Sequence, residues 1–158
     1  MWQIIIVILG ILFGLYLGNI AKDEIKNGRK YFLFFQSVIL LVLILIFLKL
    51  SFLILMGVVI GVIIGRFFKQ IYLYLGVLIL CSSFIGKEIF LAAISLVFLF
   101  SLIFQSLSKS KLKRVLFDVI LFLIPFSLLF VESFINGNLD VLVGIGIGGV
   151  IMWALSQF

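Results

Sequence analysis

The sequence predicts an all-α, polytopic integral membrane protein, a compact bundle of about seven transmembrane helices formed by one domain over residues 1–158. Its composition is 66% hydrophobic and 11% charged, whereas a soluble domain is about half apolar and about a quarter charged. Apolar runs such as residues 4–13 and 38–48 are continuous, without the alternation typical of a transmembrane β-barrel. Most of the charged residues lie in short breaks between these runs.

Seven apolar stretches are bounded by charged or polar residues. The hydrocarbon core of a bilayer requires about 17–25 residues of helix, and backbone that faces lipid must satisfy its own hydrogen bonds. Each stretch is therefore predicted to be one helical span, although the third and fourth are short for a full crossing. The predicted spans are 3–21, 31–48, 52–67, 71–85, 89–107, 115–133 and 141–156.

The basic residues predict an orientation. Ten of the twelve lie in or directly beside the first, third and fifth breaks between spans, and cytoplasmic loops are the ones enriched in Lys and Arg. The N-terminus is therefore predicted outside the cell and the C-terminus in the cytoplasm. The ten are Lys22, Lys26, Arg29, Lys30, Arg66, Lys69, Lys109, Lys111, Lys113 and Arg114, whereas Lys49 and Lys87 lie in the other breaks.

The first break, residues 21–30, is the longest predicted cytoplasmic loop, and Asn27-Gly28 predicts a turn within it. Its basic residues are candidates for contact with anionic lipid headgroups or with a partner, because each one near the membrane surface contributes about 1 kcal/mol. The alternative is a topological signal without a ligand. The residues concerned are Lys22, Lys26, Arg29 and Lys30.

Glycines recur every four residues in three of the predicted helices. Residues four apart lie on one helix face, and a face without side chains lets two helix backbones approach closely. The predicted role is packing within the bundle; the alternative is the interface of a homo-oligomer or of a larger membrane complex. The glycines are Gly10, Gly14, Gly18, Gly57, Gly61, Gly65, Gly144 and Gly148.

Polar residues inside the predicted spans are few, and Asp118 is the principal candidate. An ionisable residue within a span marks a functional site by default. Asp118 follows Arg114 by four residues, so it forms either an interfacial ion pair or a cytoplasm-facing site for a cation or proton. Gln36, Ser101 and Gln105 are expected at a similar depth, with the last two on one face of their helix.

The sixth predicted span also contains the only proline, Pro125, which removes a backbone hydrogen bond and is expected to kink the helix. Glu132 lies near its outer end, where it either faces external water or lines a path. Hydroxyls in other spans either line such a path or bond to their own helix backbone. They belong to Ser82, Ser83, Ser95 and Ser127.

Several functional classes lack the residues that they require. The chain has no histidine and a single cysteine, Cys81, so neither a metal site nor a cofactor is predicted. Basic residues confined to short interhelical breaks do not indicate nucleic-acid binding. The Ile-, Phe- and Lys-rich composition favours an AT-rich genome, and we expect the cell membrane of a prokaryote.

Three functions fit the sequence. The first is a transporter or channel for an ion or small solute, because of the helix count, the kinked sixth span and Asp118. The second is a non-catalytic membrane subunit or scaffold, because of the glycine faces. The third is an enzyme that modifies lipid at the cytoplasmic surface through Asp23, Glu24 or Asp118, although no histidine or deeply placed carboxylate pair supports catalysis.

Overall fold

The computed structural model describes residues 3–47, 51–108 and 112–157, which are helical almost throughout and contain no β-strand. Seven α-helices and one 3-10 helix follow one another with very short links. They are α1 (Gln3–Ile20), α2 (Lys22–Phe47), α3 (Phe52–Phe67), α4 (Ile71–Ile85), α5 (Lys87–Leu107), α6 (Leu112–Leu123), the 3-10 helix η1 (Ile124–Val131) and α7 (Glu132–Leu155).

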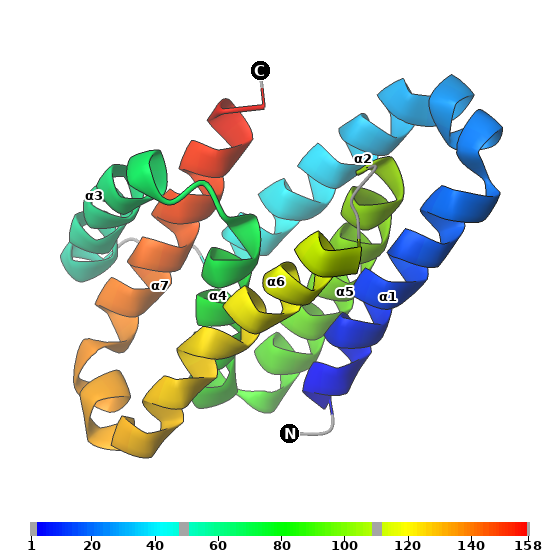
Figure 1. Ribbon diagram of the computed structural model, residues 1–158. Helices are drawn as coiled ribbons and strands as arrows, with labels where there is room; N and C mark the ends of the chain where they lie inside the picture. The colour runs from blue at the N-terminus through cyan, green and yellow to red at the C-terminus, as the bar shows by residue number, and fades with distance from the viewer. Residues whose placement is uncertain (1–2, 48–50, 109–111, 158) are drawn as a thin grey trace.

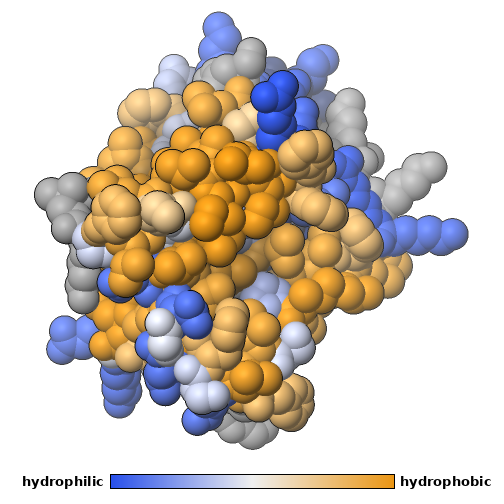
Figure 2. All heavy atoms as spheres, turned by 90° about the vertical axis from the view of Figure 1, so that its left-hand side faces the viewer, coloured by the Kyte–Doolittle hydropathy of each residue, from blue (hydrophilic) through white to orange (hydrophobic). Residues whose placement is uncertain are grey.

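Within the described residues, four helical stretches are long and apolar enough to cross a bilayer. They are Gln3–Ile20, Asp23–Phe47, Lys87–Leu107 and the combined stretch Leu112–Leu155, while α3 and α4 are shorter apolar helices. Large apolar side chains cover much of the outer surface, and Figure 2 shows them spread across the side that faces left in Figure 1. These features confirm an all-helical protein of the membrane type.

The first predicted loop is wrong. α2 begins at Lys22, so the predicted turn at Asn27-Gly28 is a continuous part of a helix of 26 residues. Asp23 and Glu24 occupy its first turn, where negative charge is stabilised by the helix dipole. At about 1.5 Å per residue the helix is longer than the hydrocarbon core of a bilayer is thick.

The sixth and seventh predicted spans differ from the observed helices. α6 ends at Leu123 and the chain continues as η1 with Pro125 in its first turn, because proline cannot donate the hydrogen bond that an α-helix requires there. α7 begins at Glu132, before its predicted start at residue 141, and contains a non-helical residue at Asn138 (φ −126°, ψ 20°). The predicted kink is therefore a whole 3-10 segment.

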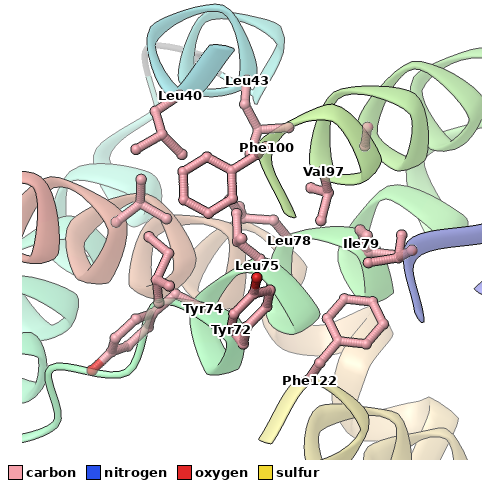
Figure 3. Close-up of a cluster of buried hydrophobic side chains, with 14 of the residues drawn as sticks. Leu40, Leu43, Tyr72, Tyr74, Leu75, Leu78, Ile79, Val97, Phe100 and Phe122 are labelled. Carbon is pink, nitrogen blue, oxygen red and sulfur yellow. The ribbon is translucent and has the colours of Figure 1, made fainter. Parts of the chain in front are cut away.

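Successive helices run up and down the bundle in alternation, and the two termini lie at opposite ends (Figure 1). α1 packs along α5, and α3 packs along α7, while α4 contacts α5, α6 and α7. α4 is buried over most of its length. Figure 3 shows its side chains meeting those of α2, α5 and α6 in the core, including Leu43, Leu75, Phe100 and Phe122.

The α1–α2 turn, the α3–α4 link and the start of α6 lie toward the upper end of the bundle in Figure 1. These are the segments that carry most of the basic residues of the sequence. The exposed basic side chains described there include Lys26, Arg29, Lys30, Arg66, Lys69, Lys113 and Arg114. The side chain of Lys22 and the residues Lys49, Lys109 and Lys111 lie outside what the structure describes. We call this end of the bundle the basic end.

Candidate functional site

A buried hydrogen bond joins α5 to α6 near the basic end. Gln105 donates from Nε2 to Oδ2 of Asp118 over 2.8 Å, and the two side chains are 1% and 4% exposed. Arg114, one turn before Asp118, is exposed and close enough for its charge to act on the carboxylate. The hydrogen bond of Asp118 nevertheless goes to a neutral amide on another helix, so the acid points into the bundle.

α4 brings Tyr72 to the same level. Gly76, one turn after Tyr72, lies directly against the carbonyl oxygen of Phe122, one turn after Asp118. Residues four apart share a helix face. The contact between α4 and α6 therefore sets Tyr72 beside the part of α6 that carries Asp118, and the absence of a side chain at Gly76 is what permits it.

Two buried hydroxyls beside Asp118 have no hydrogen-bonding partner within the part of the chain that the structure describes, those of Tyr72 and Ser101. These residues are 1% and 0% exposed. The Tyr72 hydroxyl lies close to the side chains of Ser101, Gln105 and Asp118. By contrast, the hydroxyl of Tyr74 donates to the carbonyl oxygen of Phe68 over 2.8 Å, and Figure 3 shows the two tyrosines turned to different sides of α4.

Ser101 also departs from the behaviour of other serines in the bundle. A serine within a helix commonly donates to a carbonyl three or four residues earlier, and Ser82, although equally buried, does so with Ile79 at 2.7 Å. The same backward hydrogen bond is made by Ser37, Ser83, Ser95, Ser106, Ser127 and Ser156. The hydroxyls of Ser82, Ser83, Ser95 and Ser127, predicted as possible path-lining groups, are thus engaged by their own helices.

Aromatic rings close the polar site on the side of α7. The Phe104 ring packs edge-on against Tyr72, with centroids 5.8 Å apart, and against Trp153 at 5.5 Å. Phe100 stacks on Phe104 at 5.7 Å. The polar groups of Asp118, Gln105, Tyr72 and Ser101, which we call the polar cluster, therefore lie next to an apolar wall.

Gln36 reaches a comparable depth from α2. It is 6% exposed, and its Oε1 has no hydrogen-bonding partner among residues 3–47, 51–108 and 112–157. It lies one turn from Leu40, which Figure 3 shows near Phe100. Gln36 is therefore a further buried polar group toward the basic end, placed on a separate helix from the polar cluster.

The opposite end of the bundle carries the other sequence candidates. Pro125 is buried at the start of η1, and Glu132 is exposed at the start of α7. A half-open cavity of about 320 Å³ lies nearby and does not include Asp118. It is lined by Gln3, Ile4, Ser83, Lys87, Phe90, Phe126 and Leu129.

The predicted glycine faces lie against neighbouring helices of the same chain. A Cβ built on Gly61 would meet the Ile145 backbone, with its Cα at 2.8 Å, and one on Gly148 would meet the backbone of Val58. One on Gly14 would meet the Leu102 carbonyl and lie 2.9 Å from Cβ of Gln105. The contacted helix is α7 for Gly57, Gly61 and Gly65, α3 for Gly144 and Gly148, and α5 for Gly10, Gly14 and Gly18.

Asp118, Gln105 and Ser101 were predictable from the sequence as site residues, whereas Tyr72 was not predicted. Its phenol is easily taken for an interfacial aromatic, since it stands at the start of an apolar helix. The sequence did contain one indication of the role of Tyr72, which is its spacing of four residues from Gly76. This spacing places Tyr72 on the helix face that another backbone approaches.

The chain matches no protein-family model, and no curated protein or solved structure is similar to it at a significant level.

Proposed function

We propose that the protein is a transporter or channel that moves an ion or small solute across the cell membrane of a prokaryote. In this proposal the chain crosses the bilayer seven times, counting α6 with η1 as one crossing, with the N-terminus outside and the basic end in the cytoplasm. The alternating helix directions in Figure 1 support the count. The distribution of Lys and Arg supports the orientation.

The polar cluster is the observation that carries the proposal. A carboxylic acid that is 4% exposed in an apolar bundle costs several kcal/mol unless it is protonated or paired. Gln105 supplies one neutral hydrogen bond. The buried hydroxyls of Tyr72 and Ser101 add a further cost, about 1–3 kcal/mol for each group left without a partner. Such an arrangement is explained by a ligand that binds there.

The segment α6–η1, residues 112–131, is the proposed moving element. It carries Asp118 toward one end and Pro125 and η1 toward the other. A 3-10 run longer than about 3–4 residues is uncommon, and within a helix it often marks a hinge. Phe126 and Leu129 of η1 also line the cavity at the far end, so a shift of this one segment would alter both the cavity and the polar cluster.

The subunit or scaffold alternative has weaker support. It rested on glycine faces as docking surfaces for other proteins, and those faces are filled by helices of the same chain. We therefore retain transport as the proposed function, with lipid as the surrounding partner and anionic headgroups as proposed contacts of Lys26, Arg29 and Lys30.

The test is flux through liposomes that contain the purified protein. We expect uptake of protons, ²²Na⁺, ⁸⁶Rb⁺ or a small organic solute above that of empty liposomes, and a loss of at least about tenfold in Asp118→Asn, equivalent to 1.4 kcal/mol. Glu132→Gln is the control, because this acid is exposed at the other end of the bundle. If no solute moves, or if Asp118→Asn transports like the wild type, the proposal is wrong.

A further inference from the structure

We propose that the polar cluster binds a dehydrated alkali-metal cation, Na⁺ or K⁺, through oxygen atoms of Asp118, Tyr72 and Ser101. Gln105 is a positioning residue that holds the carboxylate from the side. This inference rests on the proposed function, since it names the class of ion that the transport site would take. The binding itself can be tested without flux.

The charge of the cluster selects a monovalent cation. It contains one carboxylate, that of Asp118, and otherwise neutral groups. Among the described residues no three of His, Cys, Asp and Glu come together, and a divalent ion usually draws on more than one negatively charged ligand or on bound phosphate. An anion would be repelled by the carboxylate. One positive charge would leave the buried site neutral.

The types of atom select a hard cation. Hydroxyl and carboxylate oxygens suit hard ions, whereas soft ions prefer thiolate or thioether groups. The hydroxyls of Tyr72 and Ser101 lack hydrogen-bonding partners among the described residues. Each still has oxygen lone pairs that can be offered to a cation.

A proton on Asp118 alone would leave these hydroxyls without an evident role. A proton binds to one carboxylate oxygen and needs no additional oxygen ligands. Phe in place of Tyr72 and Ala in place of Ser101 would then serve the fold better, because they avoid burying unpaired hydroxyls. A cation that has lost its hydration shell requires several oxygens at once, which is what the cluster offers.

The experiment is thermal unfolding of the purified full-length protein in detergent, in NaCl, KCl or choline chloride at equal ionic strength. A ligand that binds the folded state alone raises the unfolding temperature with its concentration. We expect a rise with Na⁺ or K⁺ over choline, loss of this rise in Asp118→Asn, and an affinity at least about tenfold lower in Tyr72→Phe and Ser101→Ala.

Two matched controls separate binding from folding. Tyr74→Phe removes a hydroxyl with a hydrogen bond, so it is expected to lower stability in every salt and keep the cation response. Ser82→Ala replaces a serine as buried as Ser101, and this variant is also expected to keep the cation response. In choline, Tyr72→Phe should unfold at the same temperature as the wild type or higher, because it removes an unpaired buried group.

The outcomes distinguish this inference from the proposed function. Equal unfolding temperatures in the three salts, or an unchanged cation response in both Tyr72→Phe and Ser101→Ala, would overturn the cation site. Proton flux that depends on Asp118 without any response to Na⁺ or K⁺ would also overturn it, while the transport proposal would stand. A cation response without flux of any solute would support the site and contradict transport.

Discussion

Two contacts within this bundle use opposite means to hold helices together. α3 and α7 meet through their backbones, since Gly57 and Gly61 face α7 while Gly144 and Gly148 face α3. α4, α5 and α6 meet around polar side chains, of which Asp118 and Gln105 are paired. The first contact stabilises the fold by close packing along the glycine faces, with one polar pair near the start of α3, where Ser51 donates to Asp140 over 3.3 Å. The second contact carries a desolvation cost, and its polar groups are able to bind a ligand.

The largest effect on stability is expected at the glycine contact. A Cβ added at Gly61 would lie 2.8 Å from Cα of Ile145, so Gly61→Ala forces α3 away from α7. Overpacking of this kind costs about 3 kcal/mol. The measurement is unfolding in mixed detergent and SDS micelles, followed by circular dichroism.

Gly137→Ala is the matched control, because a Cβ there would meet nothing within 4 Å. A glycine in a helix is less stable than alanine by about 0.5–1 kcal/mol, so this variant should be as stable as the wild type or more stable. Equal losses in the two variants would show that the closeness of the α3–α7 backbones does not determine stability.

A smaller effect is expected at the polar cluster, and it should have a different form. Gln105→Leu removes the hydrogen bond to Asp118 and is expected to lower the free energy of unfolding by about 2 kcal/mol, because a buried acid loses its partner. The same unfolding assay measures it.

The double variant Gln105→Leu, Asp118→Leu provides the comparison. Replacing both members of a buried polar pair by apolar side chains is often neutral or stabilising, so the double variant is expected within about 1 kcal/mol of the wild type. If the double variant instead loses as much stability as Gln105→Leu or more, the pair stabilises the fold in its own right, and the cost that we assign to the polar cluster is wrong.

The sequence predicted the helices well where lipid alone dictates them. An apolar run bounded by charge has no alternative to a helix in hydrocarbon, and α3 and α4 begin and end at the predicted residues. It failed at 21–30 and around Pro125. A charged segment can continue a helix beyond the membrane, and a proline does not specify how many residues after it become 3-10.

Part of the candidate site was also predictable. The spacing of Ser101 and Gln105 assigns them to one face of a helix, and Asp118 stands out as an acid within an apolar run. Which helix that face meets could not be predicted, because helix pairing depends on packing between segments far apart in the chain. Tyr72 enters the site only because Gly76 lets α4 lie against Phe122 of α6.

The smallest effect is expected at Arg114, and it tests which partner matters to Asp118. Arg114 lies one turn before the acid and is exposed, and exposed ion pairs contribute about 0–1 kcal/mol. Arg114→Gln is therefore expected to change stability by no more than about 0.5 kcal/mol. Lys113→Gln, also exposed, controls for the loss of one positive charge at the basic end.

A loss in Arg114→Gln as large as that in Gln105→Leu would mean that Asp118 belongs to an interfacial ion pair, the alternative that the sequence left open. The cation response would then have to be reassigned, because a carboxylate neutralised by arginine has no charge left for Na⁺ or K⁺. A negligible loss, together with a full cation response, would leave the carboxylate without a permanent counter-charge. The site would then be neutral only when a cation or a proton is bound, and the salt comparison with Tyr72→Phe decides between the two.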